Sequence, residues 1–225
     1  MNKLSVTEFY NELVNRAKNS KSELRKKYSV DKTAFTDEII KEMSDILKIK
    51  KIIYDYKDND IKVEKEYYRI DLIAWTQRKE EIKDFIKSKV KSFNPHLWDF
   101  DFAIEHENNE NDWLDEVIKL AYINCPNRVI ISYVDRNKYN DKDYLEIVEK
   151  ALNLLDPNGH KEFIKNSQDQ DEEKYEFGII LGSCHSEYDG DVMSEEYYEK
   201  VIDYQLYMIK FDKNKDIKYT YEKIS

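Results

Sequence analysis

Acidic side chains recur at alternate positions of the segment 98–107, where Asp99, Asp101, Glu105 and Glu107 are separated mostly by apolar residues. Successive side chains of a β-strand point to opposite faces, so this spacing predicts a strand with a row of carboxylates on one face. Like charges on one strand face repel each other unless a cation or a basic group lies among them. The row therefore indicates a functional rather than a stabilising role.

A third acid, Asp71, lies in the apolar run 70–75, which predicts another strand. Taken alone, Asp71 is also consistent with an edge-strand residue that faces water. Glu105 and Glu107 are two residues apart and project to the same side, and with Asp71 from a neighbouring strand they would form an all-oxygen site for Mg²⁺ or Mn²⁺. Such a site can polarise a phosphodiester and activate a water molecule for in-line attack.

The elements that must position these acids are expected to alternate along the chain. Predicted helices cover 1–50 (two helices), 78–90, 112–124 and 144–155, and predicted strands cover 51–56, 67–75, 98–107, 128–134, 175–182, 204–209 and 217–221, with a short strand around 61–63. The strand–helix–strand passage from 98 to 134 predicts a parallel pair joined by a crossover. We expect an α/β fold with a mixed central β-sheet flanked by helices.

Composition limits the class of protein. With 225 residues, 40% hydrophobic and 13% aromatic, the chain is expected to fold as a single domain, residues 1–225. Its helical N-terminal part would span 1–50, its catalytic core 51–135, and its C-terminal strands and helices 136–225. The net charge of −10 argues against broad, nonspecific binding of nucleic acid.

Cellular location is predicted from two further features. Cys125 and Cys184 lie beside apolar runs and are expected to be buried free thiols rather than a disulfide. The N-terminus lacks the apolar core of a signal peptide, and no apolar run approaches the roughly 20 residues that span a bilayer. A cytoplasmic protein without a membrane partner is expected.

The order of motifs resembles the PD-(D/E)xK nuclease superfamily over roughly residues 35–135. An acid in a hairpin strand is followed by Glu-x-Glu late in the next strand, then by an amphipathic helix and an apolar strand, and the Glu-x-Glu variant occurs in some type II restriction endonucleases. The resemblance implies a restriction endonuclease-like fold and Mg²⁺-dependent hydrolysis of phosphodiesters, in DNA rather than RNA. It further implies an endonuclease of restriction or defence type that cuts both strands as a homodimer.

The resemblance also implies roles for individual residues. Asp71 matches the first acid and Glu105 the second, and both would hold the metal. The backbone carbonyl of His106, between the two glutamates, would complete the metal shell. Glu107 stands where most members of the superfamily carry lysine, and it would act as a further metal ligand or as a base.

Two other positions are candidates for completing the catalytic set. Lys119 on the following helix could reach back to replace the missing lysine, although an ion pair with Asp115, four residues earlier, explains it equally well. Some related folds add an acid from the helix before the hairpin. Glu38 and Glu42, one turn apart, are the candidates for that role, and a solvated helix face is the alternative explanation.

Two further functions remain open at this point. A catalytically inactive protein of the same fold would act as a binding or interaction module, and the missing motif lysine and the acidic charge favour it. An acidic interaction or immunity-type protein unrelated to nucleases is the other. A sheet in which the strands of Asp71 and Glu105 are not neighbours would indicate that last class.

Overall fold

A computed structural model describes residues 4–19, 32–53, 61–67, 70–77, 98–107, 113–136, 139–157, 175–184, 204–212 and 218–224. The helices in these ranges are α1 (Val6–Asn19), α3 (Lys32–Ile53), α5 (Trp113–Ala121) and α6 (Asp141–Leu155). The strands are β1 (Ile61–Tyr67), β2 (Ile70–Gln77), β3 (Trp98–Glu107), β4 (Asn127–Asp135), β5 (Glu176–Cys184), β6 (Tyr204–Asp212) and β7 (Lys218–Lys223). The helix predicted at 78–90 lies outside the described residues.

The seven described strands form one sheet whose order follows the chain, from β1 to β7. β1, β2 and β3 are antiparallel to one another, β3, β4 and β5 are parallel, and β6 and β7 return antiparallel. β3 and β4 are the parallel pair that the sequence predicts, with α5 between them in the chain, and the C-terminal strands β6 and β7 pair with each other. The mixed sheet with helices on both sides confirms the expected α/β class.

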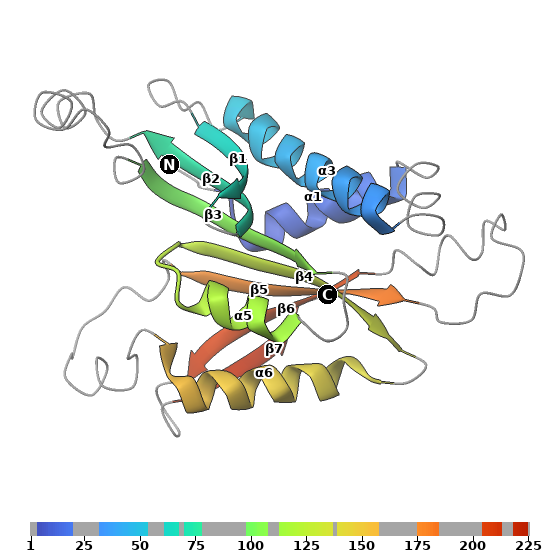
Figure 1. The fold of residues 1–225 in the computed structure, drawn as a ribbon, viewed down its shortest axis with the longest axis vertical. Coiled ribbons are helices and arrows are strands. Elements are labelled where there is room, and N and C mark those ends of the chain that lie inside the picture. The colour runs from blue at the N-terminus through green and yellow to red at the C-terminus, as the bar shows by residue number, and fades with distance from the viewer. Residues whose placement is uncertain are drawn as a thin grey trace, which may run out of the picture.

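Two helical layers enclose the sheet (Figure 1). Helices α1 and α3 cover one face, and α5 and α6 cover the other. Each helix presents an apolar stripe of period 3.6 to the sheet. In α3 the apolar residues that recur at helical spacing are all found in the core, namely Phe35, Ile39, Met43, Ile46 and Leu47. In α5 the apolar residues at helical spacing are likewise buried, namely Trp113, Val117, Leu120 and Ala121. Periodicity alone therefore identified the inner faces of both helices.

The strand predicted at 51–56 is wrong over its first half. Helix α3 continues through Ile53, and the hairpin partner of β2 is β1, which runs well beyond the short strand expected around 61–63. Extending an existing helix adds one hydrogen bond for each residue fixed, whereas a new element must be nucleated. The helix therefore overrides the β-branched character of Ile52 and Ile53.

A β-bulge interrupts the row of carboxylates expected along β3. The register between β2 and β3 shifts by one residue and inserts Asp101 as an extra residue in β3. As a result Phe100 packs on the α5–α6 side of the sheet, whereas Phe102 packs on the α1–α3 side. The expectation that 98–107 alternates without interruption is wrong, because a bulge resets which face each side chain takes.

Two further sequence predictions concern the cysteines and membrane-spanning helices. Cys125 is a buried free thiol, as predicted, while the side chain of Cys184 lies outside the description. No helix in the described part of the chain combines the length and apolar character needed to cross a membrane.

Candidate active site

Asp71 and Glu105 lie side by side on neighbouring antiparallel strands, β2 and β3. The backbone N–H of Asp71 donates to Glu105 Oε2 at 3.2 Å, and the backbone N–H of His106 donates to Asp71 Oδ2 at 2.8 Å. Each carboxylate is thus held by a main-chain donor close to the other acid. The pairing of β2 with β3 juxtaposes two acids that are 34 residues apart in sequence.

Burial makes this pair of acids electrostatically demanding. The side chain of Glu105 is only 2% exposed, and Asp71 is half-buried. Burial, helped by the carboxylates of Asp71 and Glu116, raises the pKa of Glu105 to about 8 against the opposing effect of Lys119. Burial also raises the pKa of Asp71, against the opposing effects of the His106 N–H and the Lys119 ammonium. Because burial disfavours the charged form of both acids, a nearby cation would stabilise their carboxylates.

Stability of the metal-free protein is expected to fall as the pH rises from about 4.5 to about 8. A carboxyl whose pKa is higher in the folded state binds more protons there than in the unfolded chain, so raising the pH across that window weakens folding. The Glu105→Gln variant cannot ionise at this position. The unfolding free energy of the variant minus that of wild type should therefore be at least about 1 kcal/mol larger at about pH 8.5 than at about pH 5.

Urea unfolding at the two pH values measures this difference. The matched control is Glu146→Gln on α6, where the carboxylate is 58% exposed and pairs with Lys142 on the same helix. We expect the control to follow the wild-type pH dependence. Parallel pH profiles for wild type and Glu105→Gln would contradict the prediction.

Lys119 of α5 supplies the positive charge at this pair. Its Nζ lies 2.6 Å from Glu105 Oε1, and it also pairs with Glu116 Oε2, three residues earlier on the same helix. Burial lowers the pKa of Lys119, but the carboxylates of Glu105 and Glu116 outweigh burial and hold that pKa above its usual value. Lys119 therefore reaches back to the predicted site. Glu116 is a site residue that the sequence reasoning missed, although its spacing from Lys119 was the available signal.

His106 contributes to the site through its main chain and not through its ring. The imidazole points to the opposite face, where Nε2 lies 3.0 Å from the hydroxyl of Tyr133, which is 3.2 Å from the hydroxyl of Tyr204. Burial lowers the pKa of His106 to about 3, so the ring is neutral. N–H and C=O of one strand residue point to the same side, so the His106 carbonyl faces the β2 side of β3; its place in a metal shell stays a prediction.

Three further acids lie on β3, namely Asp99, Asp101 and Glu107. Glu107 is the last residue of the strand, is half-buried, and lies two residues beyond Glu105. Asp101 is buried at the bulge, where its carbonyl accepts a hydrogen bond from Asn127 Nδ2 at 2.8 Å. The side chain of Asp99 lies outside the description. Glu107 thus stays a candidate at the edge of the site, and Asp101 is the extra residue of the bulge.

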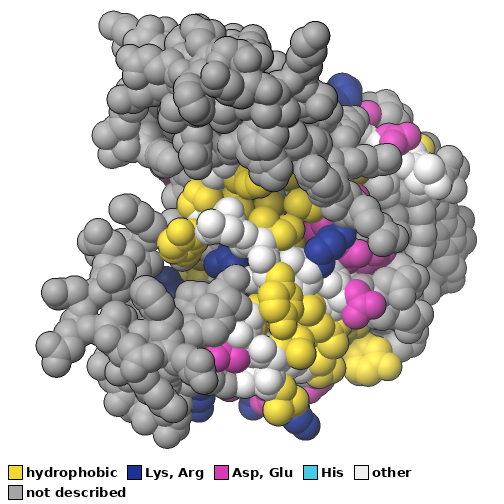
Figure 2. All heavy atoms as spheres, turned by 60° about the vertical axis from the view of Figure 1, so that its left-hand side comes forward, with side chains coloured by type: hydrophobic (Ala, Val, Ile, Leu, Met, Phe, Trp, Pro, Cys, Tyr) yellow, Lys and Arg dark blue, Asp and Glu magenta, His cyan; other side chains and the backbone are white. Residues whose placement is uncertain are grey.

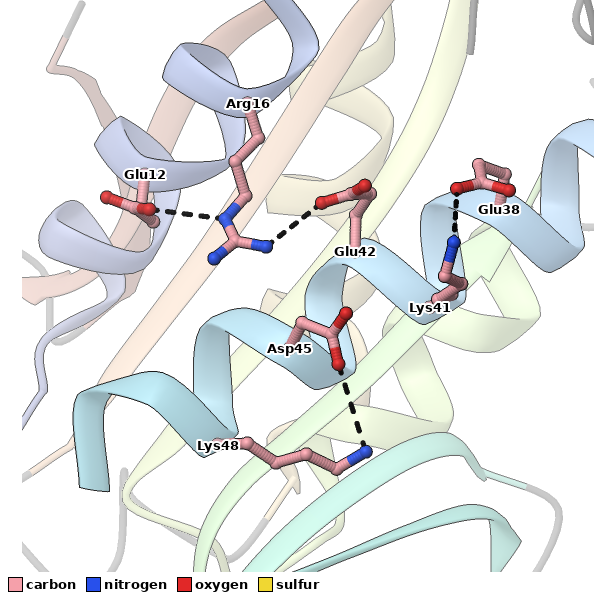
Figure 3. Close-up of polar contacts among 7 residues, drawn as sticks. All are labelled: Glu12, Arg16, Glu38, Lys41, Glu42, Asp45 and Lys48. Atoms are coloured by element: carbon pink, nitrogen blue, oxygen red, sulfur yellow. Dashed lines mark hydrogen bonds and ion pairs between the residues drawn. The ribbon is translucent and has the colours of Figure 1, made fainter. Parts of the chain in front are cut away.

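Glu38 and Glu42 are placed in the other helical layer. Glu42 pairs with Arg16 of α1 at 3.0 Å, and Glu38 pairs with Lys41 one turn away at 2.9 Å; both contacts are drawn in Figure 3. The buried stripe of α3 packs on the face of the sheet opposite to α5. The structure thus gives both acids ion-pair partners and does not place them with Asp71 and Glu105.

The donor set has a composition suited to one hard divalent ion. No group of three or more His, Cys, Asp and Glu side chains in the described ranges is arranged to hold a metal. Mg²⁺, however, is usually bound by one or two carboxylates, with water and substrate phosphate oxygens as its other ligands. Asp71 and Glu105 meet that requirement, and the His106 carbonyl would add a main-chain oxygen.

Among the described residues, the charged side chains form no continuous basic track on the face drawn in Figure 2. On that face, hydrophobic side chains form a strip, and the Lys and Arg side chains among the described residues are scattered rather than gathered. The exposed large hydrophobic residues of the described chain are Tyr122, Tyr139, Ile147, Leu154, Leu155, Tyr175 and Ile224.

Comparisons with protein families, with curated proteins and with solved structures find no match. The geometry of the site alone bears on the remaining alternatives. An interaction protein unrelated to nucleases would be indicated by a sheet in which the strands of Asp71 and Glu105 are not neighbours. In this sheet β2 and β3 are neighbours.

Proposed function

We propose that the protein is a divalent-metal-dependent phosphodiesterase of the PD-(D/E)xK type that cuts DNA as an endonuclease of restriction or defence type. The observation that carries the proposal is the meeting of Asp71, Glu105 and Lys119 at one point. Three different elements, β2, β3 and α5, deliver two acids and a cation to one face of the sheet. Two acids and a lysine are the groups that the superfamily resemblance requires.

The order of elements supports the same proposal. An acid in the hairpin strand β2 is followed by an acid late in β3, then by the amphipathic helix α5 and by the apolar strand β4, which pairs parallel with β3. This succession agrees with a restriction endonuclease-like fold. A homodimer would bring two such sites to the two strands of a duplex.

The contacts suggest a separate role for each residue of the site. Asp71 and Glu105 would hold Mg²⁺ or Mn²⁺, which when bound polarises the phosphodiester and lowers the pKa of a water molecule. The N–H groups of Asp71 and His106 orient the two carboxylates, so that little reorganisation is needed. Glu107 would serve as a further ligand or as the base. Lys119 would stabilise the charge that develops on the phosphate oxygens.

Supercoiled plasmid DNA tests the proposal directly. The wild-type protein is expected to convert it to nicked and linear forms with Mg²⁺ or Mn²⁺, and to leave it intact when EDTA is present. Gel electrophoresis at several protein concentrations measures the rate. Intact plasmid in the presence of metal, across a panel of DNA sequences, would count against an active nuclease.

A catalytically inactive module of the same fold is the second candidate. Glu105 already has a resident positive partner in Lys119, and the motif position of the catalytic lysine is occupied by Glu107. The net charge of −10 also disfavours an extended DNA surface. Calorimetric titration with Mn²⁺ separates the two candidates, because an absence of binding at millimolar metal would favour the inactive module.

A further inference from the structure

When Glu105 is ionised, Lys119 neutralises its charge within the protein itself. The Glu105 side chain is 2% exposed, and its Oε1 lies 2.6 Å from Lys119 Nζ. A buried carboxylate without a partner is costly, so an ion pair of this kind compensates much of the cost. The ammonium therefore stands beside the oxygen to which a divalent ion would have to bind. Metal and lysine compete for the same carboxylate.

Glu116 provides the same ammonium with a second partner nearer the surface. Glu116 precedes Lys119 by one helical turn on α5, and their side chains are 26% and 31% exposed. The lysine side chain is a flexible four-carbon stem with a point charge at its end. Lys119 can therefore leave Glu105 and still keep a carboxylate partner on its own helix.

We propose that Lys119 is the resident cation of this site, which a divalent ion displaces from Glu105 and which Glu116 then retains beside the bound metal. This inference rests on the proposed function, since it takes Asp71 and Glu105 as the metal-holding pair. Glu116 is accordingly a positioning residue: it keeps the ammonium within reach of a substrate phosphate oxygen after the metal enters. The same lysine thus serves the metal-free site and the metal-loaded site in two positions.

Metal affinity without any turnover provides the first test. In calorimetric titrations with Mn²⁺, Lys119→Met is expected to bind at least about tenfold more tightly than wild type, because no ion pair must be broken. The matched control is Lys142→Met, which removes an equal charge from a pair with Glu146 on α6, where the lysine side chain is 71% exposed. The control should bind Mn²⁺ as wild type does. Equal affinities for wild type and a folded Lys119→Met would overturn the inference.

Chemical labelling of lysines tests the displacement in wild type, independently of whether Lys119→Met folds. Acetic anhydride modifies free amines, and mass spectrometry of peptides quantifies each site. Saturating Mn²⁺ is expected to increase labelling of Lys119 and to leave Lys142 unchanged. With Mn²⁺ present, Glu116→Gln should label more strongly at Lys119 than wild type, since the retaining carboxylate is gone. Labelling of Lys119 that does not respond to saturating Mn²⁺ would overturn the inference.

Glu105→Gln distinguishes failure of this inference from failure of the proposed function. If wild type binds Mn²⁺, Glu105→Gln does not, and Lys119→Met binds no more tightly, the metal site stands and only the resident-cation role is overturned. If neither wild type nor Lys119→Met binds Mn²⁺, the metal site of the proposed function is overturned and this inference with it.

Discussion

Replacing Glu105 with glutamine is expected to lower kcat/KM for plasmid cleavage at least about 1,000-fold, because a metal at the site supplies several kcal/mol of transition-state stabilisation. Glutamine keeps the shape of the side chain and can still accept from the Asp71 N–H, but it lacks the charge that holds the ion. Initial rates at saturating Mg²⁺ give the comparison. Circular dichroism and urea unfolding establish that the variant is folded.

Two further variants make that result specific. Glu146→Gln on α6 removes an exposed carboxylate and is expected to cleave at the wild-type rate. A folded Glu105→Gln that cleaves at the wild-type rate would remove the site assignment. The rate of Glu107→Gln, measured beside that of Lys119→Met, decides which of the two residues takes the place of the motif lysine.

Truncating Ile104 to alanine is expected to cost about 2–5 kcal/mol of unfolding free energy. Ile104 immediately precedes Glu105 in β3, is fully buried, and pairs with Leu72, which immediately follows Asp71 in β2. Both apolar side chains pack against the α1–α3 layer, on the face opposite the carboxylates. The substitution removes buried methyl groups and leaves a cavity directly behind the site.

Urea unfolding at about pH 5, where burial of the Glu105 charge is least costly, gives the cleanest measurement. Ile147→Ala on α6 is the matched control, because that side chain is 49% exposed. Its unfolding free energy should change by no more than about 0.5 kcal/mol. A loss at Ile104 as small as the loss at Ile147 would show that this part of the core does not support the paired strands.

Most secondary structure could be predicted because its causes are local. The apolar period of α3 and α5 identifies their inner faces, and alternating or continuous apolar runs identify β2 and β4. The errors arose where two local tendencies competed. Within residues 51–53, Ile52 and Ile53 are β-branched, which favours a strand, but they continue a helix that already exists. In β3 a bulge changes which face each side chain takes, and no residue type in the sequence predicts that bulge.

The sequence by itself identified most of the candidate site residues, namely the acids Asp71, Glu105 and Glu107 and a lysine one helix later, but not Glu116. Backbone geometry is sufficient for this, since the pleat of a strand assigns side chains to faces without reference to distant residues. Only the tertiary structure decided which of these groups meet. Strand register places the N–H groups of Asp71 and His106 on the opposing carboxylates, and the packing of α5 directs Lys119 to Glu105 and Glu116. Register and helix packing depend on the buried area of the whole core, which no single segment contains.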